Sequence, residues 1–499
     1  MASLPPVLPM NHPTIRFSAS LVAALALLAS ARAVAGAVLV YGGPAYDRAT
    51  QTGYDSPDLP VAPGATVGNG MAVGAGFKYV GGQGFGTRAV RWDTSGNAAV
   101  ELGNLGTDGR GATNSGAYAI NAAGTTVGYA TKYSGGTFLD RRAVRWDASG
   151  TAATELGNLG TDSSGVSNST AFAVNAGGTA AGVAYKYVGT PPVLIGTRAV
   201  RWNASGTAAT ELGILATDSF GSSTAAAWAI NNAGTAVGFA HNNHDRPVRW
   251  DAGGTAVTEL GSLDAGTGNA QGEALAINTA GTAVGYSYKY TGRPFESDLG
   301  TRAVRWNAGG TAATELDNLG TDSTGQTFSR AYAVNDAGTA VGYAVKYTAA
   351  GTDLFTRAVR WDAGGTAATE LGKLGTDADG ITNTVANAIN AAGFTVGEAH
   401  KYANGAFVSR RAVLWGPDAV AIDLNTLIDP AGGWTLSEAR GISDGNWVSG
   451  VGLFDPDGAG PLPFYSRAFL LDVSSVVPEP ASSLTILLGA ILLHGWRRR

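Results

Sequence analysis

The chain has no cysteine among its 499 residues, and only five histidines. The absence of cysteine excludes disulfides, thiolate zinc sites, iron–sulfur clusters and cysteine nucleophiles. Charged residues are also scarce, at 14% of the chain, against about 25% in an average soluble domain. The 11 Trp, 17 Tyr and 15 Phe nevertheless supply apolar material for a core, so the low charge does not indicate disorder.

Glycine is abundant instead, with 73 residues, about twice the average usage. The glycines follow no strict three-residue period, which excludes a collagen-like chain. Glycine at this level suits a fold with many tight turns. The length leaves room for several domains or for one large β-domain.

The N-terminal segment 1–35 has the parts of a secretory signal peptide. Arg16 supplies the positive flank, and residues 21–28 (LVAALALL) form a short apolar run. Ala33 and Ala35 then place small side chains at the two positions that signal peptidase reads. We expect this segment to be removed on export, the alternative being a buried helix.

The C-terminal segment 476–499 also has three parts. Pro478-Glu479-Pro480 precedes a short apolar stretch, 484–493, and the chain ends in three arginines, namely Arg497, Arg498 and Arg499. The stretch is marginal for a stable anchor, which needs about 20 apolar residues. The arginines favour the cytoplasmic side.

This tail resembles the PEP-CTERM sorting signal of Gram-negative bacteria. The resemblance covers about the last twenty residues, and a plain tail anchor is the alternative. It implies transient anchoring in the inner membrane and processing by exosortase, a membrane protease. The expected destination is the cell surface or the extracellular matrix.

Removal of both ends changes the charge balance. Five of the 33 basic residues and one of the 38 acidic residues lie in these ends, which leaves 28 basic and 37 acidic residues, a net charge of −9. An acidic surface poor in basic residues argues against a nucleic-acid partner.

The remaining body, 36–475, is one motif repeated. The string Arg-Ala-Val-Arg-Trp or a close variant recurs at 88–92, 142–146, 198–202, 246–250, 302–306, 357–361 and 411–415, with a degenerate copy at 467–471. Seven tryptophans therefore hold equivalent places: Trp92, Trp146, Trp202, Trp250, Trp306, Trp361 and Trp415.

Two more motifs accompany each copy. The pattern Ala-x-Ala-Ile-Asn-x-x-Gly-x-x-Val-Gly stands at 117–128, 171–182, 227–238, 274–285, 331–342 and 386–397, with weaker copies around 69–74 and 442–450. A Glu-Leu pair follows each tryptophan, with glutamate at 101, 155, 211, 259, 315 and 370 and Asp423 in the seventh unit.

Each unit predicts four short antiparallel strands. Asp-x-x-Gly and Asn-x-x-Gly segments between the motifs suit type I turns that end on a glycine of positive φ. Four strands per unit, repeated eight times, predict an all-β fold, a β-propeller of about eight four-stranded blades, with seven blades or a parallel β-helix as alternatives. We expect Ala-x-Ala-Ile-Asn innermost, Arg-Ala-Val-Arg-Trp third and Glu-Leu outermost, with residues 37–41 (AVLVY) closing the eighth blade.

The repeats resemble the extracellular HAF repeat, in which His-Ala-Phe-Leu-Trp precedes Asp-Leu-Gly-x-Leu-Gly. Arg-Ala-Val-Arg-Trp replaces the first string here, and residues 467–470 (RAFL) come closest to it. Glu-Leu-Gly-Asn-Leu-Gly at 101–106 replaces the second. The resemblance implies a secreted repeat protein and carries no catalytic residues.

The repeated Arg and Glu predict a structural ion pair rather than a catalytic one, because a catalytic pair is needed once. Counting outward from the hairpin turn places Arg91 opposite Ala99, and Ala89 opposite Glu101. Arg91 and Glu101 would then be diagonal neighbours on one face. By the same count, Arg305 is the expected partner of Glu315.

Three further groups have a structural and a functional interpretation. His241, His244 and Asp245 favour a polar turn over a zinc site. The Asp-rich loops, with Asp377, Asp379, Asp455 and Asp457, favour Asx-turns over Ca²⁺. The Lys-Tyr pairs that end the second strands favour packing over stacking on sugar rings or a protein interface.

No catalytic triad, metal-hydrolase motif or phosphate loop stands out. The sequence favours a non-enzymatic scaffold or binding protein of the envelope or extracellular polysaccharide matrix, with an exopolysaccharide or envelope protein as partner and no cofactor other than the Ca²⁺ considered above. The alternative is a polysaccharide hydrolase or lyase on a propeller. Such an enzyme should carry unusual carboxylates that interrupt the repeat near the channel, and the sequence pattern reveals none.

Overall fold

The structure, a computed structural model, describes residues 39–41, 53–55, 70–92, 99–263, 270–291, 297–455, 457–458, 460 and 464–477. The predicted signal peptide with Ala33 and Ala35, and the predicted sorting tail with Pro478, Glu479, Pro480 and the terminal arginines, lie outside these residues.

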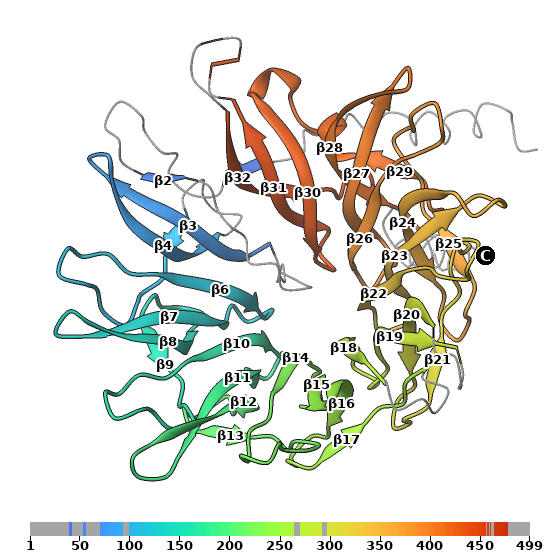
Figure 1. Cartoon of the computed structure of the whole chain (residues 1–499). Coiled ribbons are helices and arrows are strands. Elements are labelled where there is room, and N and C mark those ends of the chain that lie inside the picture. The colour runs from blue at the N-terminus through green and yellow to red at the C-terminus, as the bar shows by residue number, and fades with distance from the viewer. Residues whose placement is uncertain are drawn as a thin grey trace, which may run out of the picture.

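Eight four-stranded antiparallel sheets follow one another around a central opening (Figure 1). Blade one holds β2 (Gly53–Asp55), β3 (Ala72–Val80), β4 (Gln83–Trp92) and β5 (Val100–Glu101). Blade two holds β6 (Ser115–Ile120), β7 (Thr126–Ser134), β8 (Thr137–Trp146) and β9 (Ala153–Glu155). Blade three holds β10 (Ser169–Val174), β11 (Ala180–Val188), β12 (Val193–Trp202) and β13 (Ala209–Glu211).

The next blades repeat this order. Blade four holds β14 (Ala225–Ile230), β15 (Ala236–Asn242), β16 (His244–Trp250) and β17 (Val257–Glu259). Blade five holds β18 (Gly272–Ile277), β19 (Ala283–Tyr290), β20 (Asp298–Trp306) and β21 (Ala313–Glu315). Blade six holds β22 (Ser329–Val334), β23 (Ala340–Tyr347), β24 (Asp353–Trp361) and β25 (Ala368–Glu370).

The last two blades contain the only helical turns in the described segments. Blade seven holds β26 (Thr384–Ile389), β27 (Thr395–Ala403), β28 (Ala406–Trp415) and β29 (Ala421–Asp423). Two short 3₁₀ helices follow, η1 (Leu424–Leu427) and η2 (Pro430–Gly432). Blade eight holds β30 (Trp434–Ile442), β31 (Trp447–Phe454), β32 (Tyr465–Asp472) and β1 (Leu39–Tyr41).

The ring is therefore an eight-bladed β-propeller, which decides against seven blades and against a β-helix. Strand β1 closes it as the outer strand of blade eight, with Leu39 opposite Leu471 and Tyr41 opposite Phe469. The prediction that residues 37–41 supply this strand is confirmed for 39–41. Because β1 covers the free edge of β32, the two ends of the ring are joined within one sheet.

Neighbouring blades pack through small, repeated hydrophobic seams. Trp306 is 1% exposed and packs with Val237, Leu260, Ala274 and Val304, which come from blades four and five. The indole nitrogen of each tryptophan from the second to the seventh blade donates to a backbone carbonyl of the preceding blade, at 2.7–2.9 Å. The tryptophans thus occupy equivalent places between blades, as one residue type in a repeating position should.

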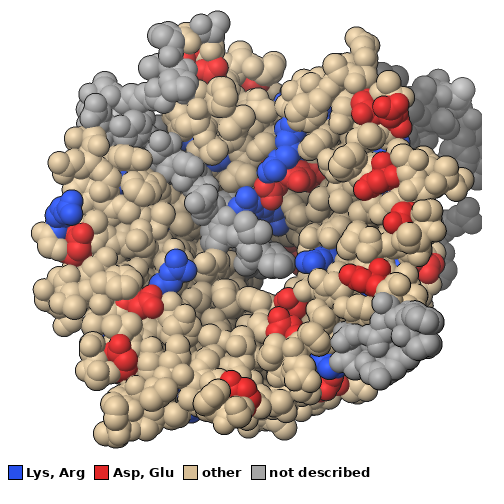
Figure 2. Space-filling view, in the orientation of Figure 1, with Lys and Arg blue, Asp and Glu red and all other residues tan. Residues whose placement is uncertain are grey.

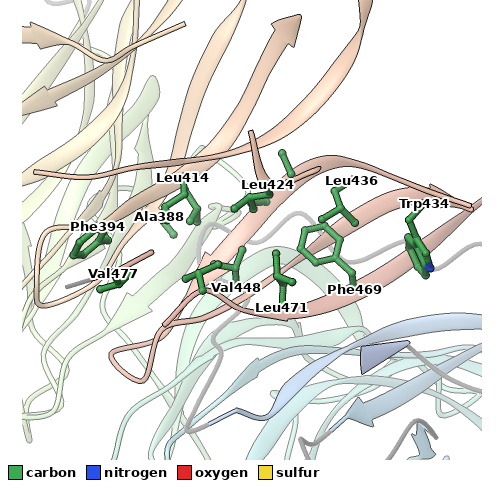
Figure 3. Close-up of a cluster of buried hydrophobic side chains, with 14 residues drawn as sticks. Ala388, Phe394, Leu414, Leu424, Trp434, Leu436, Val448, Phe469, Leu471 and Val477 are labelled. Carbon is green, nitrogen blue, oxygen red and sulfur yellow. The ribbon is translucent and has the colours of Figure 1, made fainter. Parts of the chain in front are cut away.

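The seam between blades seven and eight is built differently. Blade eight has Leu471 where the other blades have tryptophan, and the space is filled by a larger cluster that includes Phe394, Trp434 and Phe469 (Figure 3). Leu424 of η1 adds to this cluster. The irregular helical turns before β30 therefore compensate for the missing indole.

Candidate functional site in the central channel

The innermost strand of each of blades two to seven meets its neighbour at a ring of asparagines. The side-chain Nδ2 of each motif asparagine donates to the backbone carbonyl at the same position in the next blade, at 3.0–3.3 Å, from Asn121 through Asn175, Asn231, Asn278, Asn335 and Asn390 to Ser443. The Oδ1 of Asn278 also accepts from the amide of Thr282 at 2.9 Å and closes its turn. These asparagines are buried, and their bonding capacity is used within the fold.

A cavity of about 300 Å³ opens at this end of the channel, lined by the turns of blades four to eight. Its rim also contains Asp336 and Asp444. Their carboxylates accept hydrogen bonds from the backbone amides of Thr279 and Ala391, at 2.9 and 2.8 Å respectively. The polar groups of this mouth therefore hold neighbouring turns together, and we assign it a structural role.

Further along the channel, each innermost strand of blades two to seven carries a β-bulge in its Ala-x-Ala motif. At the bulge the backbones of the first and second strands approach each other closely, and a glycine in the second strand allows this. A Cβ at Gly285, for example, would lie 2.0 Å from the carbonyl oxygen of Glu273. The bulged residue is the variable x of the motif. A bulge re-aims its side chain, which makes this position suited to recognition.

In blades two to four the bulged residues form an aromatic wall, defined here as Tyr118, Phe172 and Trp228. The rings of Tyr118 and Phe172 lie 5.7 Å apart, and those of Phe172 and Trp228 lie 4.9 Å apart. Tyr129 and Phe239 support the two ends from the second strands, at 5.7 and 5.8 Å. All three wall residues are partly exposed, so their rings form a continuous half-buried apolar surface across three blades.

Blades five to eight carry charged side chains around the channel instead. We call them the charged wall, which consists of Glu273, Arg330, Glu398, Arg410, Glu438 and Arg440. The two walls join at Glu273, which accepts from Trp228 Nε1 and from the Tyr286 hydroxyl, both at 2.7 Å. Charged side chains of both signs gather beside the central opening next to β22–β30 (Figure 2).

Most of the charged wall is internally paired. Arg410 lies between two carboxylates, with its Nε 2.9 Å from Glu398 and its Nη2 2.7 Å from Glu438. Arg440 Nε lies 3.0 Å from Glu438. Burial raises the pKa of Glu398. The positive charge of Arg410 acts to lower this pKa, and the neighbouring carboxylate of Glu438 acts to raise it.

Arg330 is the exception. Its guanidinium lies 4.0 Å above the ring of Tyr286, and its Nε is buried. Among the described residues no carboxylate pairs with it, and no group accepts a hydrogen bond from its Nε. The nearby Tyr332 is also largely enclosed, and burial raises its pKa to about 12.

These charges interrupt the repeat, and the sequence interpretation missed them. The place of Glu273 and Arg330 is held by Gly116, Thr170 and Ala226 in blades two to four. The second-strand place of Glu398 is held in blades two to six by Tyr, Val or Phe. An alignment of the units by strand register would have found both positions, whereas a search for shared letters passes over them.

The predicted Arg91–Glu101 pair is wrong. Glu101 lies opposite Val90, one residue from the expected register, so its carboxylate shares a face with Arg88. This carboxylate forms ion pairs with Arg88 Nε, at 3.0 Å, and with Lys78 Nζ, at 2.8 Å. Arg91 instead reaches backbone carbonyls in the turns of the next blade, among them Asp147 at 3.1 Å.

The same Lys–Glu–Arg arrangement recurs around the ring. The partners of Glu315 are Lys289 at 2.7 Å and Arg302 at 3.3 Å, and not Arg305, which donates to Gly365 O at 2.7 Å. The lysines of the Lys-Tyr pairs therefore serve the blades themselves. In blade seven Asp423 takes the place of the glutamate, 2.9 Å from Lys401.

The remaining candidates are turns. His241 Nδ1 lies 3.0 Å from Asp245 Oδ1 across the β15–β16 hairpin, and a cavity of about 340 Å³ lies beside His241. Asp377 Oδ1 accepts the amides of Asp379 and Ile381 at 3.0 and 2.8 Å, which is an Asx-turn. Within the described part of the chain, no cluster of three or more His, Asp or Glu side chains could hold a metal ion.

In the described segments, none of the helices combines the length and the apolar character that a membrane crossing requires.

No protein-family model matches the chain, and no curated protein matches it. Solved structures with a similar course of the chain include the β-propeller domain of the Trilobed protease from Pyrococcus furiosus, at 11% identity and a TM-score of 0.37, covering 70% of this chain and 92% of that one. The Dos1 propeller shows 10% identity and a TM-score of 0.37, covering 77% and 86%. Puromycin hydrolase shows 13% identity and a TM-score of 0.41, covering 82% and 63%.

Proposed function

We propose that this protein is an exported bacterial scaffold that binds a polysaccharide of the envelope or extracellular matrix in the channel of its propeller. The observation that carries the proposal is the aromatic wall of Tyr118, Phe172 and Trp228. Flat, half-buried rings that continue across three blades suit stacking against sugar rings. The rest of each blade is occupied with its own ion pairs and seams, which leaves the variable bulge positions for recognition.

The export part of the proposal rests on the two ends of the sequence. The signal peptide 1–35 sends the chain across the inner membrane, and the PEP-CTERM-like tail holds it there until exosortase acts at Pro478-Glu479-Pro480. The freed ring carries net negative charge and no cysteine, and both properties suit a protein that works outside the cell.

The binding test uses the purified exported protein and the polysaccharide fraction shed by the producing cells. Isothermal titration should give saturable binding that Trp228→Ala and Phe172→Ala each weaken at least tenfold. The control is Phe220→Ala, because Phe220 is 85% exposed on a loop between blades and outside the channel. Equal binding by all three variants and the wild type would refute a channel site.

A second candidate function is cleavage of the same polysaccharide by hydrolysis or elimination. It is favoured by one observation: Glu398, whose pKa burial raises, and Glu438 are held on either side of Arg410. Two neighbouring carboxyl groups, one of them with a raised pKa, are the arrangement that acid–base cleavage of glycosides uses. New reducing ends that disappear in Glu398→Gln would establish cleavage, and none after long incubation would leave binding alone.

A further inference from the structure

We infer that the channel ligand is an acidic saccharide, and that Arg330 binds the carboxylate of a uronic acid residue whose ring stacks on Trp228. This inference rests on the proposed function, because it assigns the ligand class of the same site. It depends on the position where the aromatic wall meets the charged wall.

The first step concerns the charge of Arg330. The other two arginines of the charged wall are neutralised by Glu398 and Glu438. Glu273 is the acidic group that follows the aromatic wall, and it already accepts two hydrogen bonds, from Trp228 and Tyr286. Within the described residues Arg330 is therefore the one cation of this wall that no carboxylate pairs.

The second step concerns the energy of such an arrangement. A partly buried cation without a partner carries a desolvation penalty, which its position over the Tyr286 ring offsets only in part. Blades two to four manage with Gly116, Thr170 and Ala226 at this place, so the blade itself does not require an arginine. A residue that costs stability and has no structural partner is expected to serve a ligand.

The third step concerns the chemistry of the ligand. A guanidinium presents a planar fork of N–H donors that matches a carboxylate in two parallel hydrogen bonds. The contacts Trp228–Glu273–Tyr286–Arg330 connect the last ring of the aromatic wall to this fork through side chains that touch one another. A sugar ring on Trp228 and an acidic substituent at Arg330 therefore belong to one short stretch of saccharide.

The experiment measures the affinity of the exported protein for uronic acid tetramers of the galacto, gluco and manno series and for the neutral hexose tetramers of the same linkage. The wild type should bind at least one uronate tetramer ten or more times more tightly than its neutral counterpart, and the preference should shrink as salt is raised. Arg330→Gln should remove the preference, so that the uronate tetramer binds no more tightly than its neutral counterpart. Arg330→Lys, which keeps the charge and loses the fork, should retain part of it.

The matched control is Arg141→Gln. Arg141 also lies over a second-strand tyrosine, at 4.6 Å from the Tyr129 ring, but it comes from β8 and not from an innermost strand. Its loss should leave the uronate preference intact. Thermal unfolding of each variant verifies that the ring is folded.

Two outcomes would overturn the inference, and they separate it from the proposed function. Neutral tetramers that bind as tightly as uronates, with binding lost in Trp228→Ala, would keep the channel site and refute the acidic ligand. A uronate preference that survives in Arg330→Gln would refute the role of Arg330. Absence of binding to every tetramer and to the shed polysaccharide would refute both.

Discussion

Two tryptophans, Trp306 and Trp228, belong to different repeated motifs and have different roles. Replacing each by alanine should therefore separate an effect on stability from an effect on binding. Trp306 fills the seam between blades four and five at 1% exposure, and its indole donates to Gly261 O at 2.8 Å. Trp228 lies partly exposed on the aromatic wall. Trp306→Ala should therefore lower the free energy of unfolding, whereas Trp228→Ala should chiefly abolish ligand binding.

The expected magnitude for Trp306→Ala is about 3–5 kcal/mol, the range for a large aromatic side chain removed from a core. Trp306→Phe keeps most of the buried area and loses the indole donor, which leaves the Gly261 carbonyl unpaired at a cost of about 1–3 kcal/mol. Trp228→Ala removes a side chain that is only partly buried, so its cost should be smaller than that of Trp306→Ala.

The assay is urea unfolding followed by far-UV circular dichroism, with polysaccharide titration on the same preparations. Changes in the midpoint at constant slope report stability. Trp306→Ala with a near-zero effect, or with the same effect as Trp228→Ala, would refute the assignment of seam and channel tryptophans.

Three other predictions follow from separate parts of the chain. The pKa of Glu398 is raised, so the folded state holds this proton to a higher pH than the unfolded state does. The wild type should therefore lose stability relative to Glu398→Gln as the pH rises from about 4 through the folded pKa. Thermal midpoints of the two proteins that run parallel at every pH would contradict this. Replacement of residues 37–41 by a Gly-Ser sequence should expose the edge of β32, lower the thermal midpoint and cause aggregation visible by light scattering, and an unchanged protein would refute closure by β1. Alanine at Pro478, Glu479 and Pro480 should leave the chain in the inner membrane with Arg499 attached, and mass spectrometry of released protein that retains Arg499 would show that the tail is not a sorting signal.

The blade architecture could be predicted from the sequence because each blade repeats the same turns and the same buried residue types. Asn-x-x-Gly and Asp-x-x-Gly fixed the hairpins, and the unpaired segment 37–41 matched the missing outer strand of blade eight. Each of these signals is local, and in a propeller each blade contacts only its neighbours, so local signals suffice.

The pairing of side chains could not be predicted in the same way. The connection between the third and fourth strands is one residue longer than the count assumed, as the pairing of Val90 with Glu101 shows. A shift of one residue moves a side chain to the opposite face, which exchanges Arg91 for Arg88 as the partner. The contacts of Arg91 with the next blade depend on the packing of whole blades.

The candidate site could not be predicted from the sequence for a related reason. Glu273, Arg330 and Glu398 differ from their counterparts in other blades, and a search for repeated letters discards differences. They come together because the ring places the two inner strands of successive blades around one channel. The register of each strand and the position of its blade in the ring are needed to see that these residues belong to one charged wall.

The most direct test of the central claim is a cryo-electron microscopy map of the exported protein with the tightest-binding saccharide of the titrations. The account predicts ligand density in the channel against Trp228, with an acidic group at Arg330. Density on the outer strands or at the asparagine ring, with the aromatic wall empty, would contradict it.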